Sequence, residues 1–245
     1  MDIARRRVVD GVGLAVAPGE VVGVLGRNGC GKTTLIRAAL GLARLAGGRA
    51  HLAGRPVSSL GEAARARLAG YLPQERRVGW NLPAWRVAAL GAPHLAPKDA
   101  RETAMAALRA VGMESLAERG ALDMSGGERA RVLFARLLAT GAPLLLADEP
   151  AAGLDPDAQL MVMDLLRERA ARGVAVLVTL HDLTLAARSC DRLVVMGRGR
   201  VVASAAPREA LAPDVLRAAF GLNARLMETE FGQAVAGARE TGNQS

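Results

Sequence analysis

Residues 26 to 33 carry the clearest chemical signal in the chain. They read Gly-Arg-Asn-Gly-Cys-Gly-Lys-Thr and match the pattern G-x-x-x-x-G-K-[ST]. Glycines let backbone N–H groups turn inward around phosphate oxygens, and a helix starting near Thr34 adds the positive end of its dipole. Lys32 is then expected to reach the β- and γ-phosphates of ATP, and the Thr33 hydroxyl to ligate magnesium. The predicted phosphate-binding residues are Gly26, Arg27, Asn28, Gly29, Cys30, Gly31, Lys32, Thr33 and Thr34.

A second signal is a pair of carboxylates, Asp148 and Glu149, which directly follow the apolar run 144–147. Buried carboxylates are costly unless a metal or hydrogen bonds compensate them. We therefore predict that Asp148 holds magnesium and that Glu149 is the general base that activates the attacking water. Two solvated loop carboxylates are the simpler alternative, but the preceding strand is expected to be central.

Three short apolar runs position these groups. Residues 21–25, 144–147 and 174–178 are continuous apolar segments without alternation, as in strands of a parallel sheet covered on both faces. Polar residues follow each run, and ligands of open α/β sheets bind at the carboxyl ends of the strands. The sequence therefore predicts an α/β core in which three distant segments meet at one site.

The remaining segments indicate how the chain is divided. Residues 75–140 are interpreted as a helical subdomain inserted in the core, with a helix at 99–111 that ends at Gly112. A short β-hairpin is expected within 49–56. The predicted ATPase domain covers residues 1–221, and residues 222–245 are expected to form a C-terminal tail, frayed from residue 240 onward.

Composition narrows the class of protein. The formal net charge is +8, but aromatic residues make up only 2% of the chain, which disfavours stacking on nucleic-acid bases. No apolar run is long enough for a transmembrane helix, and the N-terminus does not resemble a signal peptide. Two cysteines are too few for a disulfide scaffold, and we interpret Cys190 as a small core residue.

The segment Met-Ser-Gly-Gly-Glu at 124–128 resembles the signature of the ABC transporter ATPases, usually Leu-Ser-Gly-Gly-Gln. The order of motifs is also similar to that family: phosphate loop, Gln74, signature, acidic strand end, Gly-Leu-Asp-Pro at 153–156, and His181. The resemblance extends from residue 9 to about 221. It implies a P-loop NTPase (RecA-like) core with an antiparallel β portion and an inserted α-helical subdomain.

The resemblance also implies roles for further residues. Two copies are expected to form a head-to-tail homodimer that sandwiches two ATP molecules, with the signature of one subunit facing the phosphate loop of the other. Gln74 resembles the Q-loop residue that senses magnesium and the water, His181 the switch histidine that contacts the γ-phosphate, and Asp155 the D-loop aspartate at the interface. The residues implied at the second half of the nucleotide site are Ser125, Gly126, Gly127, Glu128 and Asp155.

Each of these residues also has a structural interpretation. Ser125 with Glu128 fits a capping box at a helix start, and Asp155 fits an N-cap followed by proline at the first helical position. A lone glutamine is usually a surface residue, and a lone histidine is more often structural. For Ser125 and Asp155 both interpretations can hold together.

Two departures from the family pattern stand out. Glu128 replaces the usual glutamine and adds negative charge near a phosphate, which predicts slightly weaker closure of the dimer. No aromatic residue precedes Tyr71, although relatives carry one near position 3 or 4 that stacks on adenine. We interpret this as a shortened start.

Several stretches, including residues 71–75, 91–94 and 180–183, resemble importers of iron–siderophores, haem and cobalamin. This implies an ATP-hydrolysing subunit at the cytoplasmic face of the membrane. Its expected partners are transmembrane permease subunits and, indirectly, a substrate-binding protein, without nucleic acid. The alternatives are a soluble ABC ATPase acting on nucleic acid or ribosomes, and an exporter subunit.

Overall fold

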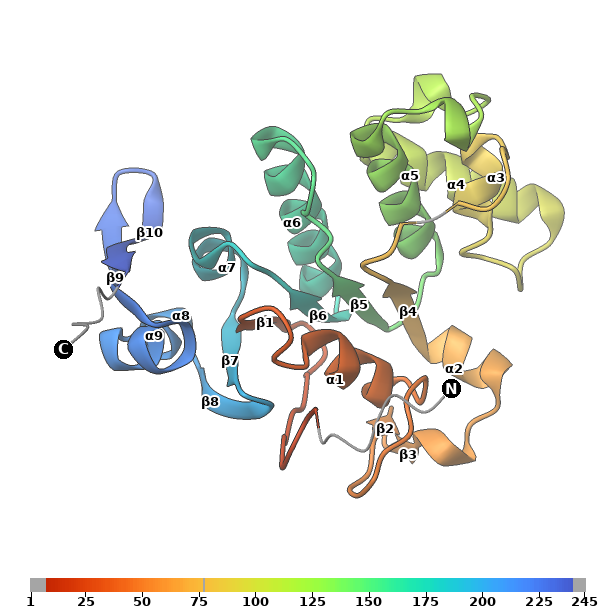
Figure 1. Ribbon diagram of the computed structural model, residues 1–245. Coiled ribbons are helices and arrows are strands. Elements are labelled where there is room, and N and C mark those ends of the chain that lie inside the picture. The colour runs from red at the N-terminus through yellow and green to blue at the C-terminus, as the bar shows by residue number, and fades with distance from the viewer. Residues whose placement is uncertain (1–7, 77, 240–245) are drawn as a thin grey trace.

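The computed structural model describes residues 8–76 and 78–239. Its centre is a six-stranded sheet with the order β4-β5-β6-β1-β7-β8, parallel except for the edge strand β8 (Figure 1). The three predicted strands are confirmed as β1, β5 and β6, which lie side by side. The strands of this sheet are β1 (Val21–Gly26), β4 (Ala69–Leu72), β5 (Leu144–Asp148), β6 (Ala175–Thr179), β7 (Arg192–Gly197) and β8 (Arg200–Ala205).

Helices cover both faces of this sheet, which explains why its strands are apolar throughout. In β1, Val22 and Val24 pack with Ile36 of α1 on one face, whereas Val21 and Leu25 belong to the core on the face of α6 and α7. Figure 1 shows α1 on the opposite side of the strands from α6 and α7. The helices are α1 (Lys32–Ala39), α2 (Glu62–Leu68), α3 (Ala84–Ala89), α4 (Pro97–Ala110), α5 (Gly126–Ala139), α6 (Pro156–Ala171), α7 (Leu183–Ser189), α8 (Pro207–Ala210) and α9 (Pro213–Phe220).

Helices α3, α4 and α5 occupy the range 75–140 and form a lobe beside the sheet, at the upper right of Figure 1. Leu108, Met113 and Phe134 are almost fully buried between them. Helix α4 begins at Pro97, two residues before the predicted start, because proline fits the first turn, where no N–H is needed. The chain enters the lobe after β4 and leaves it at β5, so both ends of the lobe lie at the central sheet.

Two small antiparallel hairpins lie outside the main sheet. Strands β2 (His51–Leu52) and β3 (Arg55–Pro56) confirm the hairpin expected within 49–56. Strands β9 (Leu222–Thr229) and β10 (Gly232–Arg239) form a second hairpin where the sequence analysis expected only a tail. It is anchored on α7, where the N–H of Val235 donates to Thr184 Oγ1 at 3.1 Å. The expectation of a frayed end at 240–245 lies outside the described residues.

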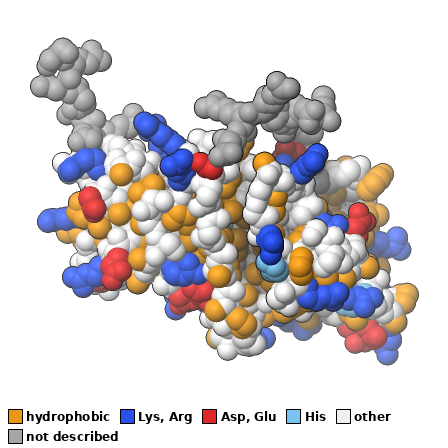
Figure 2. Space-filling view, turned by 90° about the horizontal axis from the view of Figure 1, so that it is seen from below, with side chains coloured by type: hydrophobic (Ala, Val, Ile, Leu, Met, Phe, Trp, Pro, Cys, Tyr) orange, Lys and Arg blue, Asp and Glu red, His pale blue; other side chains and the backbone are white. Residues whose placement is uncertain are grey.

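The basic residues do not gather into one patch on the face shown in Figure 2. Lys and Arg side chains lie there in separate groups, with hydrophobic and acidic side chains between them. Within the described ranges, none of the helices combines the length and the apolarity that crossing a membrane requires.

Candidate functional site

The loop between β1 and α1 wraps around a helix N-terminus. Gly31 caps α1 with φ of 107°, and a Cβ at this position would lie 2.8 Å from Val9 Cγ2. Only glycine fits this conformation and this close approach. Lys32 is buried, and its Nζ donates to the carbonyl of Gly26 at 2.8 Å, so the ammonium group lies within the loop.

A pocket of about 350 Å³ opens over this loop. It joins four separate segments of the chain: Val8, the loop after β1, Gln74 after β4 and Glu149 after β5. The residues that line it are Val8, Asn28, Gly29, Gly31, Lys32, Thr33, Thr34, Gln74 and Glu149. A pocket bordered by a helix N-terminus, a lysine and two threonine hydroxyls suits a polyphosphate.

Not every predicted loop residue faces this pocket. Arg27 is exposed, Cys30 is 7% exposed with its sulfur packed towards Gly26, and neither contributes to the lining. Val8 lies on the pocket instead of an aromatic residue. Positions 3 and 4, where the stacking aromatic was expected, are outside the described residues.

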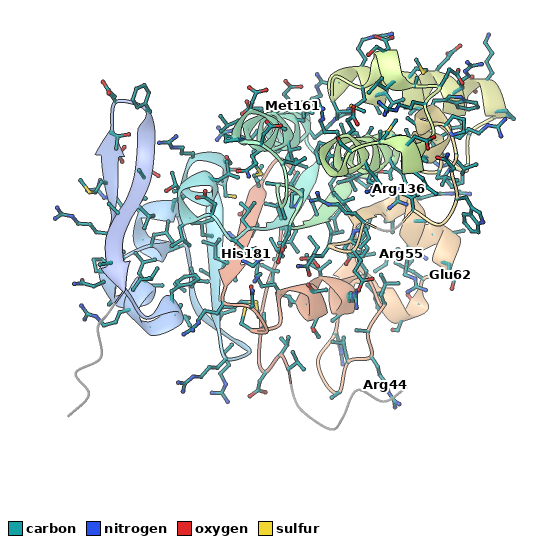
Figure 3. The ribbon with its side chains drawn as sticks, turned by 45° about the horizontal axis from the view of Figure 1, so that its top comes forward. Arg44, Arg55, Glu62, Arg136, Met161 and His181 are labelled. Carbon is teal, nitrogen blue, oxygen red and sulfur yellow. The ribbon has the colours of Figure 1, made fainter. Side chains whose placement is uncertain are left out.

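The carboxylate of Glu149 is held from two sides. Gln74 Nε2 donates to its Oε2 at 2.8 Å, and its Oε1 forms a short hydrogen bond with Nε2 of His181. The Glu149 side chain is 10% exposed and that of His181 is 43% exposed. Figure 3 shows His181 near the middle of the molecule, away from the helical lobe. Three predicted site residues therefore form one hydrogen-bonded chain at the edge of the pocket.

Asp148 is fully buried at the end of β5. Its Oδ1 accepts a hydrogen bond from Thr179 Oγ1 at 2.6 Å, while its Oδ2 has no hydrogen-bond partner among the described residues. A buried carboxylate oxygen without a partner is costly unless an ion or water meets it. Carboxylate and hydroxyl oxygens such as those of Asp148 and Thr33 are the hard ligands that magnesium prefers, and of these two residues Thr33 lines the pocket.

The residues of the predicted signature form a capped helix start, as the capping-box interpretation expected. Ser125 Oγ accepts from the Glu128 N–H at 3.2 Å, and Glu128 Oε2 accepts from the Ser125 N–H at 2.8 Å. The Ser125 N–H is the main cause that lowers the pKa of Glu128 below its usual value. None of the residues 125–128 lines the pocket over the phosphate loop of the same chain.

Asp155 also has the structural role that its position suggested. Its Oδ1 accepts from the Ala158 N–H at 2.9 Å, and Pro156 follows at the first position of α6. Like the signature, Asp155 is not part of the pocket over the phosphate loop. The structure therefore brings residues of the phosphate loop together with Gln74, Glu149 and His181, whereas residues 125–128 and 155 do not line this pocket.

Sequence reasoning missed two residues of this site. Thr179 is fully buried and joins β6 to β5, since its Oγ1 also accepts from the Glu149 N–H at 2.8 Å. A threonine that ends an apolar central strand was a usable signal. Arg76 binds the carbonyls of Glu149, Pro150 and Ala152, and nothing in its local sequence distinguishes it from a surface arginine.

The sequence is similar to curated import proteins over most of its length. The hemin import ATP-binding protein HmuV of Bordetella avium is 39% identical over 241 residues, covering 93% of this chain and 91% of that protein. HmuV of Pseudomonas aeruginosa is 42% identical over 224 residues, covering 89% and 88%. The cobalamin import ATP-binding protein BtuD of Halobacterium salinarum is 40% identical over 225 residues, but the chain spans only 56% of its length.

Solved structures share the fold. An ATP-binding cassette determined as a dimer, in a post-hydrolysis state with ADP and Pi, has a TM-score of 0.75 and 25% identity, covering 82% of this chain and 91% of that chain. The protein cbiO1 of Clostridium perfringens, part of an ABC transporter complex, has a TM-score of 0.74 and 28% identity, covering 85% and 86%. The family profile described as ABC transporter matches residues 9–152, which is more than half of the sequence. This chain therefore belongs to the ABC transporter family.

Proposed function

We propose that this chain binds ATP with magnesium and hydrolyses it to drive import through a membrane partner. The observation that carries the proposal is the hydrogen-bonded chain of Gln74, Glu149 and His181 at the edge of the pocket that Lys32 and Thr33 line. It places a carboxylate and its orienting partners beside a phosphate-binding loop. This arrangement suits attack of water on a terminal phosphate.

Magnesium suits the oxygen donors of Thr33, which lines the pocket, and of Asp148, which directly precedes the pocket residue Glu149. Thr33 and Asp148 are the proposed ligands, Asp148 through water, with Gln74 as a further oxygen donor. The partnerless Oδ2 of Asp148 supports this assignment. When bound, the ion neutralises phosphate charge.

The protein groups divide the remaining work. Glu149 takes the proton of the attacking water, because its carboxylate is held in place by Gln74 on one oxygen and by His181 on the other. Lys32 moves its ammonium group from the Gly26 carbonyl to the β- and γ-phosphates, which are stronger acceptors. His181 is the proposed contact to the γ-phosphate.

Two copies are needed for a complete site in this proposal. Ser125, Gly126 and Gly127 present a helix N-terminus, but they lie outside the pocket of their own chain. In a head-to-tail homodimer, this tip and Glu128 would face the phosphate bound by the other copy, with Asp155 at the interface. The similarity to an ATP-binding cassette solved as a dimer supports this assembly.

The proposed class of cargo rests on sequence similarity to the curated relatives and not on the residues of the site. The curated relatives import hemin and cobalamin. We assign this chain to importers of haem, cobalamin or iron–siderophore cargo, at the cytoplasmic face of the membrane. A permease and a substrate-binding protein would complete the system.

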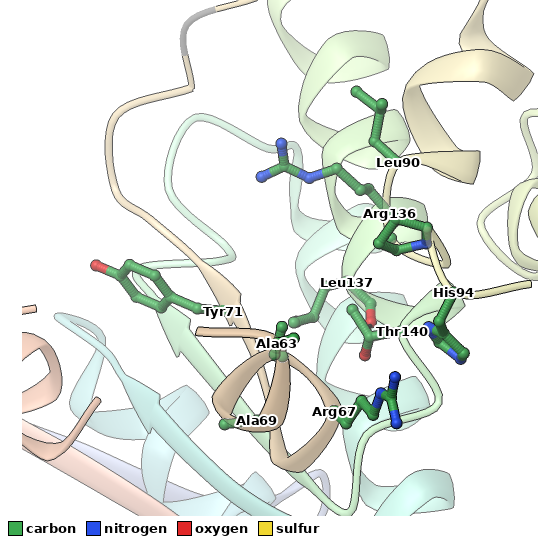
Figure 4. Close-up of a pocket in the computed structure, with 13 residues that line it drawn as sticks. Ala63, Arg67, Ala69, Tyr71, Leu90, His94, Arg136, Leu137 and Thr140 are labelled. Atoms are coloured by element: carbon green, nitrogen blue, oxygen red, sulfur yellow. Dashed lines mark hydrogen bonds between the residues drawn. The ribbon is translucent and has the colours of Figure 1, made fainter. Parts of the chain in front are cut away.

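A groove beside the helical lobe is the proposed contact for the permease. It has a volume of about 480 Å³ and lies between α2, β4 and the helices α3 and α5. Figure 4 shows Arg67, His94, Arg136, Leu137 and Thr140 around it, with the ring of Tyr71 turned away from them. Because Arg67 and Arg136 line the groove and none of its described lining residues is acidic, we expect a permease loop with an acidic residue to bind there.

The test is hydrolysis coupled to transport. The purified chain should release phosphate from ATP in a magnesium-dependent reaction, and co-reconstitution with its permease in vesicles should make cargo uptake depend on ATP. Arg136→Glu should abolish the permease-dependent stimulation but keep the basal rate. Stimulation by DNA or ribosomes, with no effect of the permease, would contradict the proposal.

A further inference from the structure

Arg76 lies two residues beyond Gln74 and holds the turn that carries the proposed base. Its Nη2 donates to the carbonyls of Glu149 at 2.7 Å and Pro150 at 2.8 Å, and its Nη1 donates to the carbonyl of Ala152 at 2.7 Å. One half-buried guanidinium therefore gathers three backbone acceptors from a single turn. Such planar, fixed donors are specific to arginine, since the lysine ammonium is a single point of charge.

This turn has a backbone conformation that needs support. Glu149 has φ of 54°, in the left-handed region that is strained for a non-glycine residue. Its N–H is fixed by Thr179 Oγ1 at 2.8 Å, and its carbonyl is fixed by Arg76 at 2.7 Å. The peptide groups on both sides of the strained residue are thus bonded to side chains from other segments.

The segment 74–76, which contains Arg76, also holds the side-chain carboxylate of Glu149. Gln74 binds the Oε2 atom of Glu149 at 2.8 Å, so residues 74 and 76 hold the side chain and the backbone of one residue. The hydrogen bond from Arg76 to the Ala152 carbonyl also fixes the backbone three residues before Asp155. Because residues 74–76 leave β4 and lead into the helical lobe, a shift of the lobe would move both sets of bonds.

The charge of Arg76 is compatible with this position. Partial burial lowers the pKa of its guanidinium, and the nearby Glu149 carboxylate opposes that shift. Hydrogen bonds from a charged donor are worth more than neutral ones, and three carbonyl acceptors replace the water that burial removes.

We propose that Arg76 is a positioning residue for hydrolysis, which fixes the backbone of Glu149 and couples it to the entry of the helical lobe. The proposal rests on the proposed ATPase function and on Glu149 as the base. Under this proposal, the binding of ATP depends on the phosphate loop, whereas the rate of hydrolysis also depends on Arg76.

The experiment compares Arg76→Ala and Arg76→Lys with the exposed control Arg44→Ala in the full chain. Steady-state phosphate release gives kcat and KM, and a fluorescent ATP analogue gives Kd. We expect kcat to fall roughly 10- to 100-fold in Arg76→Ala, as a displaced catalytic group predicts. Arg76→Lys should recover only part of the rate. KM and Kd should change less than about twofold, and Arg44→Ala should match the wild type.

A double variant tests whether Arg76 acts through the base. In a Glu149→Gln background, Arg76→Ala should cause no further loss, because the group it positions has already been removed. An unchanged kcat, or a raised KM with unchanged kcat, would overturn the proposal. If Arg76→Ala does not fold, Arg76→Lys and Arg76→Gln carry the same comparison. A wild-type chain that hydrolyses no ATP would instead contradict the proposed function itself.

Discussion

The two regions suited to phosphate differ in how their polar groups are satisfied. At the carboxyl edge of the sheet, Thr179, Asp148 and Glu149 are bonded to one another inside the molecule. At the tip of α5, the hydrogen bonds of the exposed Ser125 go to Glu128 and Arg129 of the helix that it caps. The first region is built by hydrogen bonds between strands, whereas the hydrogen bonds of the second stay within one helix start, with Arg119 as an additional ion partner of Glu128 at 3.8 Å. In the proposed function the first therefore provides the catalytic site, while the second is suited to meeting a ligand from outside its own chain.

The largest effect is expected from Glu149→Gln. The amide keeps the size of the side chain but cannot take a proton, so hydrolysis should fall roughly 100-fold or more. ATP binding should persist, and the variant should accumulate as an ATP-bound dimer on a sizing column. Full turnover in this variant would show that Glu149 is not the base and that the first region is not the catalytic one.

The buried network should also control stability. Thr179→Val keeps the shape but leaves Asp148 Oδ1 and the Glu149 N–H without their partner, which should cost about 1–3 kcal/mol. Denaturant unfolding measures this loss. Thr229→Val, at the exposed turn of the β9–β10 hairpin, is the control and should change stability by about 0.5 kcal/mol or less. Equal losses at the two positions would show that the network adds nothing.

The exposed cap should matter less for folding. Ser125→Ala removes one capping bond and should cost about 1 kcal/mol in the same unfolding assay. It should weaken ATP-driven dimerisation more than it weakens ATP binding, because the serine lies outside the pocket of its own chain. A loss of monomer ATP affinity without any change in dimerisation would contradict the division between the regions.

The smallest effect is expected from Glu128→Gln. Glutamine can still accept from the Ser125 N–H but removes a negative charge near the phosphate of the other copy, so dimerisation should strengthen by a factor of about 2–5. The folded pKa of Glu128 is lowered, so its ionised form stabilises the fold above its unfolded pKa. This contribution is lost as pH falls through the folded pKa.

The pH dependence of stability is measured by thermal unfolding of the wild type and of Glu128→Gln between neutral and acidic pH. On acidification, the free energy of unfolding of the wild type should fall towards that of Glu128→Gln, because only the wild type has an ionisable side chain at position 128. Unchanged dimer formation and turnover would show that the charge of Glu128 does not affect closure.

Local patterns predicted the parts of the site that depend on local structure. The phosphate loop, the acidic strand end and the capping box of Ser125 each follow from a few adjacent residues and the element beside them. Thr179 and Arg76 were missed because their roles depend on contacts between segments 30 or more residues apart. Such contacts are set by strand order and by the path of the chain into the lobe, which periodicity does not reveal.

The C-terminal hairpin shows a different limit. The loop between β9 and β10 is Glu230-Phe231, not the Asn-Gly or Asp-Gly pair that usually marks a two-residue turn. The positive φ is taken by Gly232, at 94°. Leu222, Ala224 and Leu226 of β9 do alternate with polar residues and pack against the core, but this alternation covers only five residues.

The central claim is that the phosphate loop of one copy and the Ser125 helix tip of the other complete a single site. Lys32→Ala and Ser125→Glu, each in a Glu149→Gln background, can be mixed and tested for retention of radiolabelled ATP on rapid filtration. Each variant alone should retain none, whereas the mixture should retain up to one ATP per mixed dimer, because one composite site is then intact. No retention in the mixture, although mixed dimers form, would contradict the account.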